Sequence, residues 1–98
     1  IGHGVALPHA LSASCLRPAI ALIRLASPIS YGGNDRTGTD IVLAILWPSS
    51  EAKSFQQAAG EFCRMLRDAN ALHSIRRATS AAEIRQVMKR FCPLPAER

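Results

Sequence analysis

The residues best suited to chemistry lie at the start of the chain, in the run Gly2-His3-Gly4-Val5-Ala6-Leu7-Pro8-His9. Glycine lets the backbone approach a bound group closely and adopt positive φ. Pro8 fixes its own φ and favours an extended conformation for Leu7. The pattern therefore predicts a short strand that presents His9 from a stiff support, where the imidazole could act as nucleophile, base or metal ligand.

Two of these chemistries need further side chains near His9. A metal site needs several ligands. His3 lies six residues before His9, but no cysteine or acidic cluster near them would complete the set, so we expect no metal. A hydrolase needs a serine or cysteine nucleophile together with a base. Ser12, Ser14 and Cys15 follow His9 closely, but no nucleophile-elbow pattern surrounds them.

In a third interpretation His9 is itself the nucleophile and takes a phosphoryl group on a ring nitrogen. The phosphoryl oxygens would then need hydrogen-bond donors. Backbone N–H groups beside Gly2 and Gly4, or in a turn over residues 10–12, would supply them. The residue chemistry alone is equally compatible with a structural histidine after a proline, so these interpretations stay open at this point.

The patterns around the motif predict an α/β domain. Apolar runs at residues 5–7, 19–25 and 41–47 indicate strands. The last two are apolar on both alternate faces, which is typical of central strands covered by helices on both sides. Residues 10–15 are small and polar and predict a loop, and residues 31–38 are rich in turn formers.

After Pro48 the apolar spacing becomes helical, and the stripe consists of Phe55, Ala58, Ala59, Phe62, Cys63 and Leu66. Ser49 or Ser50 is the expected N-cap. Asn70 either ends this helix or begins a short one. A capping-box pattern starts at Ser80 and introduces a last helix.

Composition favours one globular domain with a modest core, since the chain has 98 residues, 48% hydrophobic content and a net charge of +5. The basic residues are scattered over the expected polar helix faces, and no stripe of aromatic residues lies between them, which argues against nucleic-acid binding. Three cysteines without CxxC spacing favour free thiols in a reducing, cytoplasmic compartment. The longest apolar runs are too short to cross a bilayer.

The motif also resembles a known family. Residues 1–9 are similar to the signature around the phosphorylated histidine of enzyme IIA domains. These domains belong to the phosphoenolpyruvate-dependent sugar phosphotransferase system, in its fructose/mannitol and nitrogen-regulatory class. The likeness continues through essentially the whole chain, in Ser27-Pro28-Ile29-Ser30-Tyr31, Asp35, Asp40-Ile41-Val42-Leu43, Pro48 and residues 64–68 and 80–91.

The resemblance implies an α/β fold over residues 1–92, with a mixed β-sheet flanked by α-helices and incomplete at its N-terminus, and a loose tail over residues 93–98. It implies that His9 accepts a phosphoryl group, and that the phosphate-binding or supporting residues are Gly4, Pro8, Ala10 and Ser54. It implies no cofactor and no metal for the transfer.

The same resemblance implies the partners. A small histidine phosphocarrier protein would donate the phosphoryl group, and a sugar-permease domain, or a regulated transporter or kinase, would receive it or respond to it. Neither nucleic acid nor membrane insertion is expected. Association with a second copy is compatible with a truncated sheet edge.

Departures from the family pattern motivate an alternative function, a regulatory protein-binding module that keeps the fold and has lost transfer. The family's first helices and strand, with an arginine that helps to hold the phosphate, would precede Ile1. Ala10 and Leu11 stand where a basic residue is frequent. Phe55 stands where many members have a second histidine, and phenylalanine offers no hydrogen bond.

Overall fold

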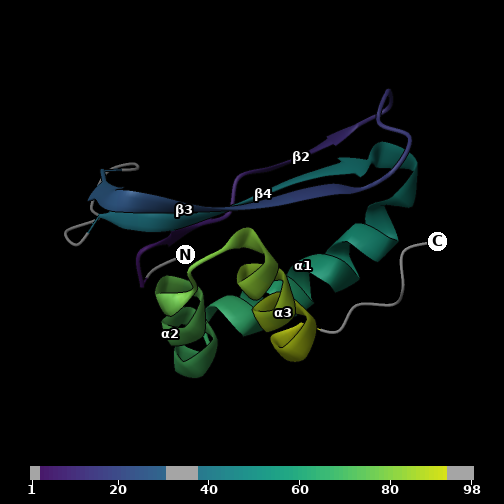
Figure 1. Ribbon diagram of the computed structural model, residues 1–98. Coiled ribbons are helices and arrows are strands. Elements are labelled where there is room, and N and C mark those ends of the chain that lie inside the picture. The colour runs from purple at the N-terminus through teal and green to yellow at the C-terminus, as the bar shows by residue number, and fades with distance from the viewer. Residues whose placement is uncertain (1–2, 31–37, 93–98) are drawn as a thin grey trace. The chain divides into compact units, whose positions relative to one another are not determined.

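The computed structural model describes residues 3–30 and 38–92. The chain divides into two compact units, Ile1–Lys53 and Ser54–Arg98, the first holding a mixed sheet and the second holding helices (Figure 1). This confirms the α/β class. Gly2, the predicted turn over residues 31–37 and the predicted tail over residues 93–98 lie outside the described residues. In the part of the chain that is described, no helix combines the length and the apolar character needed to span a bilayer.

Strand β4 (Thr39–Pro48) pairs with every other strand of the sheet. Strands β1 (Val5–Ala6) and β2 (His9–Ser12) run parallel to it along one edge, and β3 (Ala19–Ile29) runs antiparallel along the other (Figure 1). Alternate β4 side chains are buried, and these are Thr39, Ile41, Leu43, Ile45 and Trp47. The predicted central position of residues 41–47 and the predicted burial of Trp47 are therefore confirmed.

Strands β1 and β2 are two parts of one extended segment that pairs with β4 in a single register. Val5 pairs with Ile41, and four residues later His9 pairs with Ile45. The ladder is interrupted at Leu7 and Pro8 because proline has no N–H to donate. The predicted loop over residues 10–15 is wrong in its first half. Backbone pairing with β4 outweighs the turn-forming composition there.

Strand β3 is not the second central strand that the sequence predicts. Among the described residues it pairs only with β4, and its side chains Ile20 and Ile23 are 39% and 46% exposed. It also extends beyond the predicted residues 19–25 to Ile29, through a register shift after Arg24. Apolar alternation shows that a segment is a strand, but it does not show how many neighbouring strands or helices the segment has.

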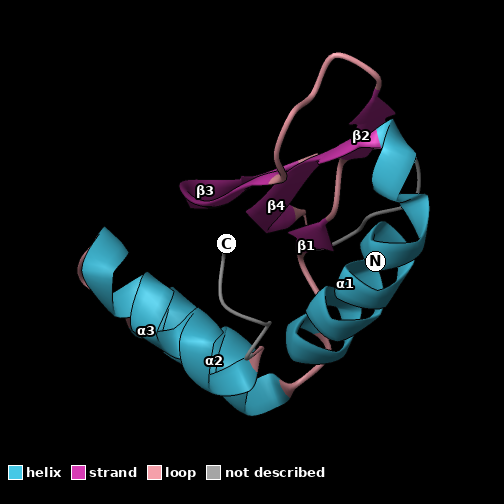
Figure 2. Ribbon diagram, turned by 90° about the vertical axis from the view of Figure 1, so that its right-hand side faces the viewer, coloured by secondary structure: helices cyan, strands magenta, loops and turns pink. Residues whose placement is uncertain are grey.

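The helical unit contains α1 (Ala52–Leu66), α2 (Ala69–Arg77) and α3 (Ala81–Phe91), and α2 packs against α3 (Figure 2). Helices α1 and α2 each have several buried apolar residues at helical spacing, whereas in α3 only Val87 is buried. The largest buried side chains of this unit are Phe62, Met65, Leu66 and Ile75. This confirms the predicted helical stripe after Pro48.

The helix starts confirm one predicted cap and correct another. Ser80 caps α3, because its Oγ accepts the Glu83 N–H at 3.1 Å. Neither Ser49 nor Ser50 is the N-cap after β4: both lie inside the 3-10 helix Ser49–Glu51, which Pro48 precedes without a side-chain cap. Of the two alternatives for Asn70, the start of a short helix agrees with the structure, because α2 begins at Ala69. Asp68 caps that helix, since its carboxylate accepts two backbone N–H groups.

Replacement of the confirmed cap tests its contribution. Ser80→Ala removes the acceptor for the Glu83 N–H and is expected to lower the free energy of unfolding by about 1 kcal/mol in urea titrations. Ser50→Ala, within the uncapped 3-10 helix, is the matched control and is expected to change it by less than about 0.5 kcal/mol. Equal losses in the two variants would contradict the capping role.

A truncation in β4 tests the packing of its buried face. Leu43 has no exposed surface, so Leu43→Ala is expected to destabilise the chain by about 2–5 kcal/mol through lost burial and a residual cavity. Leu16, which is 88% exposed, supplies the control variant Leu16→Ala, with an expected change below about 0.5 kcal/mol. Urea unfolding monitored by Trp47 fluorescence would measure both.

Candidate functional site

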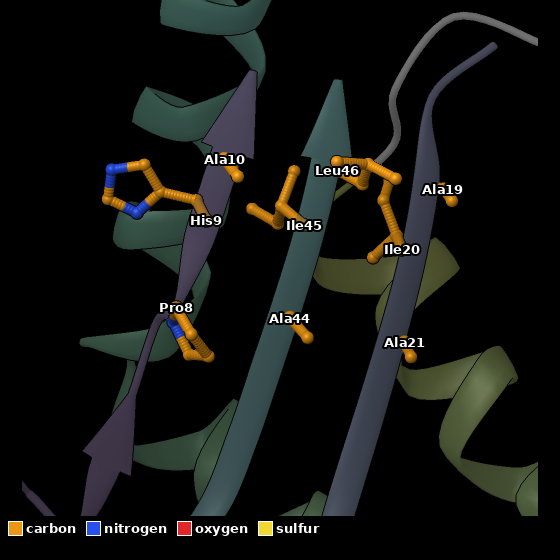
Figure 3. A pocket seen from close by; sticks show the side chains of 9 residues that line it. All are labelled: Pro8, His9, Ala10, Ala19, Ile20, Ala21, Ala44, Ile45 and Leu46. Atoms are coloured by element: carbon orange, nitrogen blue, oxygen red, sulfur yellow. The ribbon is translucent and has the colours of Figure 1, made fainter. Parts of the chain in front are cut away.

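His9 is the first residue of β2 and stands directly after the break in the ladder at Pro8. The Ile45 N–H donates to the Pro8 carbonyl at 2.9 Å, which fastens the residue before His9 to the central strand. The His9 side chain is exposed and extends away from β4 (Figure 3). A rigid backbone therefore presents an imidazole that another molecule can reach.

The orientation of the imidazole is set by the residue before the proline. Nδ1 of His9 lies 2.9 Å from the Leu7 carbonyl oxygen. Because a carbonyl oxygen only accepts, Nδ1 must carry the proton and donate it to this hydrogen bond. In the neutral ring the lone pair that can attack an electrophile is then on Nε2.

An open hollow of about 440 Å³ lies beside His9 on the sheet, and nine residues line it (Figure 3). They come from β2, β3, β4 and the residue before β2, and they are Pro8, His9, Ala10, Ala19, Ile20, Ala21, Ala44, Ile45 and Leu46. Apart from His9, the lining side chains are all apolar. The hollow itself supplies no charged side chain to a phosphoryl group.

The predicted supporting residues come from different parts of the chain. Pro8 and Ala10 flank His9 in the chain, but strand alternation places the Ala10 side chain on the opposite face of the sheet. Gly4 lies before β1 with a φ of 79°, as expected for a glycine, and its carbonyl accepts the Asp40 and Ile41 N–H groups. Ser54 is exposed near the start of α1, in the helical unit.

The geometry bears on the two alternative chemistries for His9. Strand alternation directs Ser12 to the sheet face opposite His9, and the Ser12 hydroxyl lies 2.9 Å from the Ser14 hydroxyl. A serine–histidine pair of the hydrolase kind is therefore not assembled from Ser12. No group of three or more potential metal ligands occurs within residues 3–30 and 38–92.

Two backbone groups complete this site, and sequence reasoning did not identify either of them. The Leu7 carbonyl orients the ring, and the Ile45 N–H holds Pro8 in place. Backbone groups leave no mark in side-chain identity. The only available signal was Pro8 itself, because a proline has no N–H to donate to a ladder and favours an extended conformation for the residue before it.

Comparison with known proteins identifies what this arrangement is similar to. Residues 1–91 match the family model "Phosphoenolpyruvate-dependent sugar phosphotransferase system, EIIA 2". The chain is 32% identical over 91 residues to the nitrogen regulatory protein homolog of Haemophilus influenzae, covering 91% of this chain and 56% of that protein. It is 28% identical over 89 residues to the nitrogen regulatory protein of Escherichia coli, covering 90% of this chain and 55% of that protein.

The fold also matches a solved structure. The crystal structure of nitrogen regulatory protein IIA-Ntr from Neisseria meningitidis superposes with a TM-score of 0.83 at 22% identity, covering 89% of this chain and 60% of that one. This likeness establishes the fold. The chain spans a little over half the length of the curated relatives that it matches.

The assignment of the ring proton gives a spectroscopic prediction. In long-range ¹H–¹⁵N correlation spectra of the neutral ring, Nδ1 of His9 is expected to show the shift of a protonated nitrogen and Nε2 that of an unprotonated one, because of the bond to Leu7. The exposed His73 on α2 is the internal reference. A predominantly Nε2-protonated His9 would contradict the hydrogen bond.

Proposed function

Because this chain belongs to the EIIA 2 family of the phosphoenolpyruvate-dependent sugar phosphotransferase system, we propose that it is a phosphoryl-accepting domain of the nitrogen-regulatory kind, with His9 as the acceptor. The observation that carries the proposal is the exposed His9 imidazole, fixed by the Leu7 carbonyl within the motif that the family model matches. The named relatives, which are nitrogen regulatory proteins, support the regulatory branch.

The proposed step is a transfer between two imidazoles. The Nε2 lone pair of His9 attacks phosphorus as the P–N bond to the donor histidine breaks, and the donor imidazole leaves with that electron pair. The His9 ring gains positive character while Nδ1 keeps its proton. The Leu7 carbonyl stabilises this charge because hydrogen bonds from charged donors are stronger. Positioning and charge stabilisation supply the catalysis, with no covalent participation by a further side chain.

The supporting residues have distinct roles in this proposal. Pro8 holds the acceptor through its bond to the Ile45 N–H, and Gly4 shapes the turn that leads into β1. Ala10 follows the acceptor in β2 and pairs with Leu46, so it supports the backbone that carries His9. Ser54 would offer its hydroxyl to a phosphoryl oxygen.

The proposed partners follow from the family. A histidine phosphocarrier protein would donate the phosphoryl group. A regulated transporter or kinase, or a sugar-permease domain, would receive it or respond to the phosphorylated form. The whole protein's activity belongs to this proposal as well, because the chain covers only part of its relatives.

Phosphorylation with matched histidine variants tests the acceptor. The chain would be incubated with ³²P-labelled phosphoenolpyruvate, enzyme I and a histidine phosphocarrier protein. Wild type and His73→Ala are expected to be labelled equally, with a label that is stable to alkali and lost in acid. Labelling of His9→Ala is expected to fall to the background, because the proposal assigns the acceptor role to His9 alone.

Two outcomes would contradict the proposal in different ways. Undiminished labelling of His9→Ala would show that His9 is not the acceptor. If a folded wild-type chain takes up no label, the alternative of a regulatory binding module without transfer is favoured. Phe55, which stands where many family members have a histidine, motivates that alternative.

A further inference from the structure

The positive charge of this chain is concentrated in its helical unit. Residues 54–92 contain seven arginines and lysines against three acidic residues, which is four of the five net charges. The nucleotide-stacking aromatic residues expected of a nucleic-acid surface are not interleaved with these cations. Such a concentration on one unit favours an acidic protein partner.

A groove of about 380 Å³ is lined by residues from α2, α3 and the segment that joins them, within the helical unit. Its lining combines basic, polar and small apolar residues, which are His73, Ser74, Arg77, Ala78, Glu83, Gln86, Val87 and Arg90. Ala78 and Val87 are each only 6% exposed. They give the groove a small apolar floor between polar side chains of the two helices.

The two arginines of the groove come from opposite walls. Arg77 lies on α2, one turn after His73, and Arg90 lies on α3. Within the described residues neither Arg77 nor Arg90 forms an ion pair, whereas Arg64 on α1 pairs with Glu61 at 2.6 Å. The Arg90 guanidinium lies over the Phe91 ring, 5.7 Å from its centroid, a contact that leaves its N–H groups able to donate to a carboxylate.

The one acidic residue in the lining is already engaged. Oε1 of Glu83 accepts the Thr79 N–H at 2.7 Å as part of the start of α3. The lining therefore contains two guanidinium groups and one carboxylate, and that carboxylate is already hydrogen-bonded at the start of α3. This leaves an excess of hydrogen-bond donors and of positive charge in the groove.

We propose that the groove between α2 and α3 binds an acidic segment of a partner protein, with Arg77 and Arg90 each pairing with a carboxylate. A small side chain between the two carboxylates would rest on Ala78 and Val87, while Ser74 and Gln86 bond the peptide backbone. Arginine suits this role because its planar fork binds carboxylates bidentately. This surface is separate from His9 and does not depend on phosphoryl transfer.

A charge-matched pair of variants tests the groove. Binding of a fluorescein-labelled oligoglutamate peptide would be measured by anisotropy for wild type, Arg77→Glu/Arg90→Glu and Arg85→Glu/Lys89→Glu. Both doubles change the net charge equally, but Arg85 and Lys89 do not line the groove. The first double is expected to weaken binding about tenfold or more, and the second by less than about threefold. His9→Ala is expected to bind like wild type.

Three results would overturn the proposal. The first is no binding of the peptide by wild type. The second is an equal loss of affinity in both doubles, which would indicate diffuse net charge. The third is tighter binding of an oligouridylate of matched charge through the same arginines. Circular dichroism checks that the doubles are folded. If charge reversal unfolds the chain, Arg77→Gln/Arg90→Gln and Arg85→Gln/Lys89→Gln answer the same question, with a smaller but still unequal loss expected.

Discussion

Backbone pairing to strand β4 is the interaction on which the described sheet depends. β1, β2 and β3 pair with β4 and, among the described residues, with no other strand. Within the described sheet, the chemistry-bearing segment is hydrogen-bonded through the parallel ladder that runs from Val5 opposite Ile41 to Ser12 opposite Pro48. The strong apolar character of β4 fits this central position, because a strand with a neighbour along each edge buries more of its length.

The position directly after Pro8 is what distinguishes His9 from an ordinary strand residue. The Pro8 carbonyl accepts the Ile45 N–H and keeps the segment attached to β4. Successive carbonyls of an extended chain point to opposite sides, so the Leu7 carbonyl is directed away from β4, where Nδ1 of His9 binds it. Pro8 fixes its own φ and favours an extended conformation for Leu7, and it therefore restricts the backbone that carries both partners of the ring hydrogen bond.

The sequence predicted structure correctly where the pattern lies within a few consecutive residues. It failed where contacts between distant segments determine the structure. The Ser80 cap followed from four consecutive residues and is confirmed. A short helix beginning near Asn70 was one of two alternatives, and α2 begins at Ala69, but the sequence did not single out Asp68 as its cap. Ser54 and Ala10 remain predictions from the family resemblance.

The amino-acid sequence by itself determined the family, the α/β class, the helical stripe after Pro48 and the identity of His9 as the candidate acceptor, since each depends on side-chain type and spacing along the chain. Tertiary structure decided that residues 9–12 form a strand, that β3 is paired along only one edge, and that the Leu7 carbonyl sets the ring proton. Tertiary structure also decided that Arg77 on α2 and Arg90 on α3 line one groove. Backbone hydrogen bonds and the faces that two elements share arise only when distant segments meet, so no local pattern encodes them.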